Sequence, residues 1–255
     1  MLNRQDTFQS STADLMADCP LLLDVYFQPI LDTRTASIKG TEALLRVHTD
    51  NGDIETDRFL DSLRDAGQSD ALDRWVIEQS LISYTRWLRR YSLDLMLYIN
   101  ISEETLKAPD FHQFIADVME RYEVYPDFIV LEIDIDHCIE PSCYQNLRQL
   151  RKTGVNIAVD NIGKGNENSA YLMEDVFDIF KLDKNLFNPS ECQMKVQNQL
   201  LRLNQHNAEV VAVGVEQTEQ VLWCKRTGIK LFQGYFTSQP LPADDFESWF
   251  LRGHA

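Results

Sequence analysis

Short apolar segments alternate with longer amphipathic stretches along this chain of 255 residues, and that alternation constrains its fold more than any other feature. The short segments are rich in Val, Ile, Leu and Phe, which is typical of buried strands. Strands that alternate with helices favour a mainly parallel sheet, and eight is the number that closes a barrel. The eight candidates are Val25–Leu31, Ile38–Arg46, Leu93–Ile101, Phe128–Ile135, Val155–Asp160, Ile179–Leu182, Glu209–Gly214 and Leu231–Phe236.

The intervening stretches carry apolar residues at helical spacing, and two of them end in glycine. Gly154 and Gly228 each stand just before a strand, where a helix C-cap is expected. A doubly wound open sheet is the rival fold, but no G-x-G-x-x-G motif follows the first strand. We therefore predict a TIM-type (β/α)8 barrel. Its expected helices are Trp75–Arg90, Phe111–Tyr122, Tyr144–Lys152, Met194–His206, Glu219–Arg226 and Asp244–Leu251.

The length suits one large barrel or two ordinary domains, and no segment rich in Pro, Gly or Ser marks a linker. We expect an N-terminal extension over residues 1–20 and a single barrel domain over residues 21–255. The five cysteines form no C-x-x-C pair, no apolar signal segment opens the chain, and the apolar runs are strand-sized. These features predict a soluble, cytoplasmic protein with reduced thiols.

The formal charge of −16 restricts the partners that the surface can meet. Such a surface repels nucleic-acid phosphates, and it disfavours anionic membranes for the same reason. We therefore expect no nucleic-acid polymer and no membrane as partner. A small anionic ligand is still compatible with this charge where a local Arg, Lys or metal ion overrides the global field.

Polar side chains gather at the predicted C-terminal ends of the strands, which is where (β/α)8 barrels carry their functional groups. Taken singly, such an acid is more often a helix cap or a solvated residue, but polar residues on successive strands favour a common site. Carboxylate and amide oxygens suit Mg²⁺ or Mn²⁺, which accompany phosphate groups. The residues alone thus predict a divalent-metal, phosphate-ligand site. Its members are Glu42, Arg46, Asn100, Glu132, Asp134, Asp136, Asp160, Asn161, Lys181, Asp183, Glu216 and Gln233.

The same residues resemble a known family, the EAL domains of cyclic di-GMP phosphodiesterases. Thr41–Arg46 (TEALLR) resembles the EAL signature, and Tyr26–Ile30 (YFQPI) resembles the segment that precedes it. The resemblance continues in order from about Val25 to Phe250. Its further segments are Asn100–Ser102 (NIS), Glu132 with Asp134 and Asp136 for E-x-T-E, Asp160–Gly165 (DNIGKG) for D-D-F-G-x-G, Phe180–Asp183 (FKLD), Val211–Glu216 (VAVGVE) for A-E-G-V-E, and Gln233–Phe236 (QGYF) with Pro240-Leu241.

The resemblance implies a barrel with one antiparallel strand, often dimeric, that hydrolyses cyclic di-GMP with two Mg²⁺ or Mn²⁺ ions. In a two-metal site the ions stabilise both the attacking water and the leaving oxygen. Carried over, the metal ligands would be Glu42, Asn100, Glu132 and Asp160, and Lys181 would orient water or phosphate. The ligand-binding residues would be Gln28, Glu42, Leu44, Arg46, Asn100, Lys181, Gln233 and Pro240.

Two departures from the family pattern bear on activity. Asn161 replaces the second Asp of the D-D pair, and an amide lacks the charge that holds a second dication. Val213 replaces the first Glu of A-E-G-V-E, and an isopropyl group neither binds metal nor moves a proton. Losing one positioned acid–base group costs on the order of 10²–10⁴ in rate. We therefore predict a degenerate, stand-alone EAL domain that binds Mg²⁺ or Mn²⁺ weakly or not at all.

Three functions stay open at this point. The chain is a cyclic di-GMP receptor or regulatory protein-interaction module in bacterial second-messenger signal transduction, with little or no hydrolysis. It is a phosphodiesterase of weak or altered activity, in which Lys181 is the remnant of the catalytic set. Or it binds a protein partner without the nucleotide. We expect cyclic di-GMP and a protein as partners, and a homodimer is compatible with the resemblance.

Overall fold

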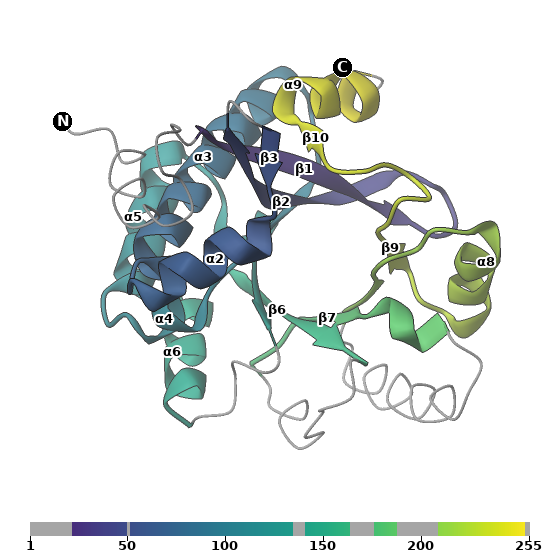
Figure 1. The fold of residues 1–255 in the computed structure, drawn as a ribbon. Coiled ribbons are helices and arrows are strands. Elements are labelled where there is room, and N and C mark those ends of the chain that lie inside the picture. The colour runs from purple at the N-terminus through teal and green to yellow at the C-terminus, as the bar shows by residue number, and fades with distance from the viewer. Residues whose placement is uncertain (1–21, 50–51, 135–140, 164–175, 188–208, 253–255) are drawn as a thin grey trace.

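The eight predicted strands are present and close into a barrel (Figure 1). The structure, a computed structural model, describes residues 22–49, 52–134, 141–163, 176–187 and 209–252. Around the barrel the strand order is β1, β2, β4, β5, β6, β7, β8 and β9, and β9 returns to β1. The strands are β1 Leu22–Asp32, β2 Ile38–Thr49, β4 Met96–Asn100, β5 Ile129–Asp134, β6 Asn156–Ile162, β7 Ile179–Leu182, β8 Glu209–Ala212 and β9 Leu231–Phe232.

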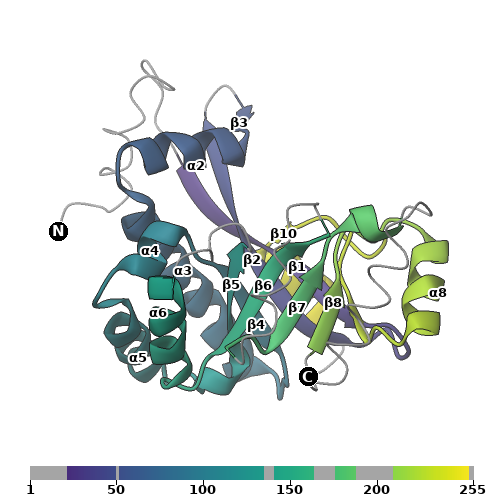
Figure 2. The ribbon, with the colours of Figure 1, turned by 90° about the horizontal axis from the view of Figure 1, so that it is seen from below.

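One strand runs against the others. β1 pairs antiparallel with both β2 and β9, whereas every pair from β2–β4 to β8–β9 is parallel. The expected barrel with one antiparallel strand is therefore confirmed. β1 and β2 also pair from Leu22↔His48 onward, well beyond Ala43↔Ile99, where the pairing of β2 with β4 ends. Together with β3 (Gly52–Ile54) and α2 (Thr56–Asp65), this extension stands above the barrel rim (Figure 2).

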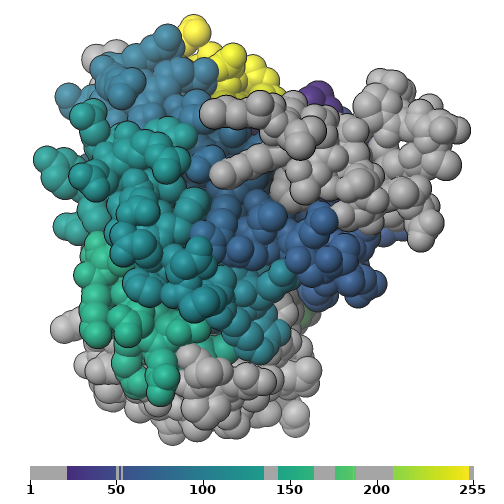
Figure 3. All heavy atoms as spheres, turned by 90° about the vertical axis from the view of Figure 1, so that its left-hand side faces the viewer, coloured from purple at the N-terminus to yellow at the C-terminus, as the bar shows by residue number. Residues whose placement is uncertain are grey.

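Helices cover the outside of the barrel, and most match the predicted ranges. α3 (Ser69–Arg90) begins six residues earlier than predicted, and α5 (Phe111–Tyr122) has the predicted bounds. The further helices are α4 Glu103–Lys107, α6 Pro141–Arg151, α8 Thr218–Thr227 and α9 Ala243–Phe246, which continues into a π-helical turn at Glu247–Leu251. Residues of α3, α5 and α6 form a continuous layer on one side of the molecule (Figure 3). The predicted helix Met194–His206 lies outside the described residues.

Four short elements were not predicted: β3, α2, α4 and the two-residue strand β10 (Leu241–Pro242), which pairs with β1. Of the two predicted glycine caps, the one at Gly228 is confirmed, whereas Gly154 lies three residues after the last residue of α6. Gly228 is the C-cap of α8 at φ +82°, and Gly154 has φ +95° after α6, a conformation that glycine adopts without strain. Within the described residues, no helix has the length and apolar character needed to cross a membrane.

Two apolar clusters hold the fold together. The larger cluster lies between the strands and the outer helices. It includes a group of aromatic rings where β1, α3 and α9 meet. The Phe27 and Trp87 ring centroids are 4.7 Å apart, and those of Trp87 and Phe246 are 5.0 Å apart. Phe27, Trp87 and Phe246 are fully buried. The C-terminal α9 thus packs on β1 and α3, so closure of the barrel depends on both ends of the described chain.

We predict that Trp87→Ala lowers the free energy of unfolding by about 3–5 kcal/mol, because it leaves a cavity between β1, α3 and α9. Trp249→Ala is the matched control, since Trp249 is 75% exposed, and we expect a change within about 0.5 kcal/mol. Urea unfolding followed by tryptophan fluorescence and circular dichroism measures both variants. Equal losses in the two variants would contradict this assignment of the core.

Candidate functional site

The barrel interior is built in two layers, an apolar floor and a polar layer above it. Side chains along a strand alternate between its faces, so residues two positions apart share the interior face. The floor consists of Ile30, Tyr98, Val130, Ala158, Ile179, Val211 and Leu231. Two residues farther toward the C-terminal rim on each strand stand Gln28 (on antiparallel β1), Asn100, Glu132, Asp160, Lys181, Val213 and Gln233.

Glu42 joins the polar layer from β2, two residues after Gly40. A Cβ at Gly40 would lie 2.7 Å from Cε2 of Tyr98, so glycine leaves room for that ring in the floor. Above it, the Glu42 carboxylate accepts three hydrogen bonds: from Lys181 Nζ at 2.9 Å and Gln233 Nε2 at 2.7 Å on Oε2, and from Asn100 Nδ2 at 2.8 Å on Oε1. Four strands are thereby joined at one carboxylate.

The electrostatics of Glu42 follow from these contacts. Burial alone would raise the pKa of its carboxyl, but Lys181 and the donated hydrogen bonds outweigh burial and lower the pKa to about 2. Glu42 is therefore ionised at neutral pH. Gln233 Nε2 also donates to Gln28 Oε1 at 3.0 Å, and Gln28 Nε2 donates to the Ser238 carbonyl at 3.0 Å, which ties this centre to the rim.

Lys181 lies between two buried carboxylates. Its Nζ is 2.9 Å from Glu42 Oε2 and 2.6 Å from Glu132 Oε1, and all three side chains are almost fully buried. Burial lowers the pKa of Lys181, but Glu132 and Glu42 outweigh it and raise the pKa. Burial and then the charge of Glu42 raise the pKa of Glu132. Glu132 Oε2 has no hydrogen-bond partner among the described residues.

A bulge in β6 shapes the next part of the site. The pairing of β6 with β7 shifts between Val159 and Ile162, and Asn161 adopts φ +65° there. Asn is one of the few residues that tolerate this left-handed conformation. The Asn161 Nδ2 donates to Asp134 Oδ2 at 2.6 Å, and its backbone N–H donates to Asp160 Oδ1 at 2.7 Å. Burial raises the pKa of Asp160, and Lys181 opposes it in part.

Val213 is the one apolar member of the polar layer. Its side chain packs against the floor cluster, and its backbone N–H donates to the Leu182 carbonyl at 2.8 Å. Val213 therefore faces the barrel interior among groups that could bind or move protons. It can do neither.

A cavity of about 430 Å³ opens above the polar layer, between the β1–β2 extension, α2 and α3. Glu42, Leu44, Arg46 and Asn100 line it, as the resemblance implies for ligand-binding residues. Arg46 lies with its guanidinium 5.5 Å from the Tyr26 ring centroid, and its Nη1 donates to the Leu45 carbonyl. Pro240 lies in the loop before β10 and is not among the lining residues.

The sequence analysis did not identify the helical wall of the cavity, which includes the charged residues Asp57 and Arg64 on α2 and Asp73 on α3. All three sit on amphipathic helices, where a charged residue usually marks the solvated face. For Asp73 a signal was present, because it follows Leu72 and precedes Val76 on a face that is buried. Asp136 and residues 164–175 of the loop after β6 lie outside the described residues.

The side chains of the polar layer and of Asn161 fit a two-metal centre poorly. Asn161 offers an amide turned toward Asp134, Val213 offers no donor atom, and the ammonium of Lys181 lies between the two carboxylates of Glu42 and Glu132. Within the described ranges, no three acidic, His or Cys side chains converge closely enough to hold a metal ion. We derive no metal-dependent step for this site.

Comparison with known proteins decides the family. Residues 22–240 match the model of the EAL domain. The chain belongs to the EAL domain family. Its relatives include the probable cyclic di-GMP phosphodiesterases PdeB and PdeN of Escherichia coli (strain K12). PdeB is 27% identical over 88% of this chain and 44% of its own length, and PdeN is 30% identical over 89% and 45%.

These relatives are longer proteins, and the EAL chain spans less than half of their length. Among solved structures, the EAL enzyme Bd1971 in its cAMP- and cyclic-di-GMP-bound form superposes with a TM-score of 0.85 at 22% identity, over 98% of this chain and 69% of that chain. At that identity the likeness establishes the barrel fold, in agreement with the strand order above.

We predict that Lys181→Met destabilises the protein by about 3–5 kcal/mol at pH 7, because Glu42 and Glu132 then share a buried site without a cation. Both carboxyls would titrate above their unfolded values in this variant, so its stability should recover as pH falls from 7 toward 5. Urea unfolding at several pH values measures this. Lys184→Met, an exposed lysine three residues away, is the control; an equal loss there, or no recovery in acid, would contradict the ion cluster.

Proposed function

We propose that this EAL domain binds cyclic di-GMP with little or no phosphodiesterase activity and acts as a receptor or regulatory protein-interaction module. The observation that carries the proposal is the composition of the polar layer: the groups that would hold a phosphodiester are present, while Asn161 and Val213 occupy two interior positions where the family carries acids. The names of the relatives support the ligand, since PdeB and PdeN are probable cyclic di-GMP phosphodiesterases.

Binding is supported by the cavity and its charges. Arg46 offers the planar fork that suits a phosphodiester oxygen pair, and Leu44 offers an apolar surface to a base. The whole chain carries a formal net charge of −16, so this arginine supplies a local exception to a repulsive field. Glu42 is fully engaged by Lys181, Gln233 and Asn100 and stays ionised, which preorganises the floor of the cavity.

Hydrolysis needs a base for the attacking water and an acid or cation for the leaving oxygen. Val213 directly follows β8 and occupies its place in the polar layer, and its side chain can serve neither purpose. Lys181 is held between Glu42 and Glu132 with a raised pKa, so it orients negative groups and does not release its proton near pH 7. Lys181 and Glu42 thus act as positioning groups, and Val213 cannot transfer a proton at its place in the polar layer.

A second function has one specific observation in its favour. The buried Glu132 Oε2 lacks a hydrogen-bond partner among the described residues, and an unpaired buried carboxylate oxygen is costly unless a cation or water satisfies it. The alternative function is therefore a phosphodiesterase of weak or altered activity, in which a water or a cation would satisfy this oxygen. Among the described residues, the acids do not converge on a metal position by themselves. The proposal also includes the cytoplasm as the compartment, a protein partner, a homodimer, and a barrel domain that extends over residues 21–255.

We predict that Asn161→Asp combined with Val213→Glu raises cyclic di-GMP hydrolysis by at least about 10²-fold over the wild-type chain in Mn²⁺. The product, the linear dinucleotide, is measured by chromatography. The two single variants, Asn161→Asp and Val213→Glu, serve as controls. A pair at Asn156 and Val210 is unsuitable, because Val210 is buried in the core. A folded double variant that stays inert would show that the loss of activity lies elsewhere than in these two side chains.

We predict that Arg46→Ala weakens cyclic di-GMP binding by roughly 10- to 100-fold, because one charge-assisted pair contributes about 1.5–3 kcal/mol. Arg89→Ala on the exposed end of α3 is the matched control and should bind like the wild type. Calorimetric titration measures both. An Arg46→Ala variant with unchanged affinity, or one that retains cellular function fully, would favour a protein module that works without the nucleotide.

A further inference from the structure

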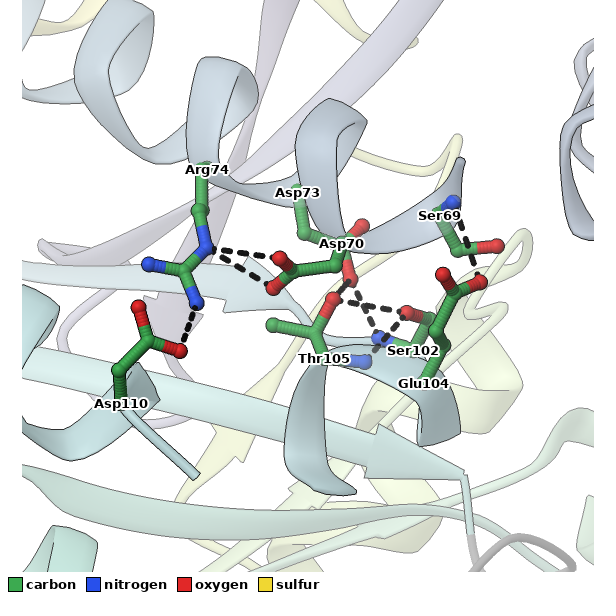
Figure 4. Close-up of polar contacts among 8 residues, drawn as sticks. All are labelled: Ser69, Asp70, Asp73, Arg74, Ser102, Glu104, Thr105 and Asp110. Carbon is green, nitrogen blue, oxygen red and sulfur yellow. Dashed lines mark hydrogen bonds and ion pairs between the residues drawn. The ribbon is translucent and has the colours of Figure 1, made fainter. Parts of the chain in front are cut away.

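A second buried acid lines the cavity without belonging to the polar layer. Asp73, in the first turns of α3, is 9% exposed and lies on the cavity wall beside Leu72 and Val76. Its Oδ2 accepts two hydrogen bonds from the segment after β4: from the Ser102 backbone N–H at 2.7 Å and from Thr105 Oγ1 at 2.6 Å (Figure 4). Asp73 therefore joins α3 to the start of α4.

The segment that Asp73 holds carries a residue of the polar layer. Ser102 is two residues after Asn100, whose Nδ2 donates to Glu42. The residue between them, Ile101, donates its backbone N–H to the Glu132 carbonyl at 2.9 Å. The chain that leaves β4 is thus fixed from β5 on one side and from α3 on the other. Asn100 is the last residue of β4 and pairs with Glu132 of β5, so it lies directly before the segment that Asp73 holds.

Among the described residues, no cation forms an ion pair with Asp73. The adjacent Arg74 turns away and binds Asp70 and Asp110, with 2.9 Å contacts to each. Figure 4 shows the two networks side by side. Burial is the main cause that raises the pKa of Asp73, to about 6, and the hydrogen bonds from Thr105 and Ser102 oppose it only in part. The ionised side chain therefore lowers folding stability at neutral pH.

We propose that Asp73 is a positioning residue for nucleotide binding: by holding the Ser102 amide and Thr105 hydroxyl, it fixes Asn100 against Glu42 and presets the ligand cavity. This inference rests on the proposed function. A buried carboxylate that costs stability is expected where function needs it, and its contacts lead to the site through Ser102. A purely structural anchor would instead be expected to stabilise the fold.

The test compares Asp73→Asn, Thr105→Val and the double variant, with Asp70→Asn as the matched control three residues earlier on the same helix. Asparagine keeps the shape of Asp73 but is a weaker acceptor for both donors, and valine removes the hydroxyl. We expect about 10-fold weaker cyclic di-GMP binding for Asp73→Asn, several-fold weaker binding for Thr105→Val, and no further loss in the double variant. Asp70→Asn should bind like the wild type.

The double-mutant cycle separates positioning from direct contact. Coupled effects support the proposal. Additive effects mean that the Asp73 carboxylate acts on the ligand itself and overturn it, as does an Asp73→Asn variant with wild-type affinity. Stability gives an independent readout. Relative to the wild type, Asp73→Asn should gain stability as pH rises from about 4 to 6, because over this range the unfolded wild-type chain releases the Asp73 proton while the folded protein, with an Asp73 pKa of about 6, retains it. A loss of stability at every pH would overturn the proposal in favour of a structural anchor.

Other titratable groups lie near Asp73 or line the same cavity, and their titration also changes stability with pH. Each variant is therefore compared with the wild type at each pH. These groups are Asp70 and Arg74 on α3, Glu104 on α4, and, around the cavity, Glu42, Arg46, Asp57, Arg64 and Asp134.

One readout does not need the ligand. In the free protein, Asp73→Asn should shift the side-chain amide resonance of Asn100 and speed amide hydrogen exchange at Ser102, whereas Asp70→Asn should not. If the wild type fails to bind cyclic di-GMP but these changes occur, the proposed function fails and the positioning role stands. If the Asn100 resonance and the Ser102 amide are unchanged in Asp73→Asn, the positioning role fails whatever the ligand.

Discussion

The site depends on one interaction, the ammonium of Lys181 held between the buried carboxylates of Glu42 and Glu132. Two buried carboxylates would repel each other, and a buried lysine would lose its proton, unless each compensated the other. Because the three groups come from β2, β5 and β7, their mutual attraction joins strands far apart in the sequence. Gln233 and Asn100 complete the hydrogen bonds of Glu42 from two more strands. The polar layer is therefore held in place by its own hydrogen bonds and ion pairs, and a ligand must adapt to it.

In and beside the polar layer, the chain differs from its family at neighbouring positions. The family pattern that this sequence resembles has Thr at the position of Asp134 and Asp at the position of Asn161. Here the acid stands on β5, and an amide stands on β6 in place of the acid. The two side chains bind each other, with Asn161 Nδ2 2.6 Å from Asp134 Oδ2. The local charge is kept while the ligand geometry changes. Together with Val213, this arrangement underlies the proposal that the cavity binds a nucleotide without cleaving it.

Much of this architecture was predictable from the sequence, because strand periodicity fixes which residues share a face. Glu42, Glu132, Lys181 and Gln233 stand at strand ends, and the barrel rule brings such residues to one rim. The bulge at Asn161 was not predictable, since it depends on a register shift between β6 and β7. The place of Arg64 in the cavity wall was not predictable either, because helix periodicity does not tell which end of a helix faces a site. The short helix α4 was not predicted for a similar reason: its first turn is held by hydrogen bonds from Ser102 and Thr105 to Asp73 of α3.

The most direct test of the account is calorimetric titration of the purified protein with cyclic di-GMP, run in Mg²⁺ or Mn²⁺ and again in EDTA, with the cell contents checked for linear dinucleotide. The account predicts saturable binding under both conditions and no appreciable product over the titration. Metal-dependent appearance of the linear dinucleotide at a rate typical of enzymes would contradict it, because proton transfer would then proceed without acids at positions 161 and 213. An absence of binding heat under both conditions would contradict the nucleotide-binding role itself.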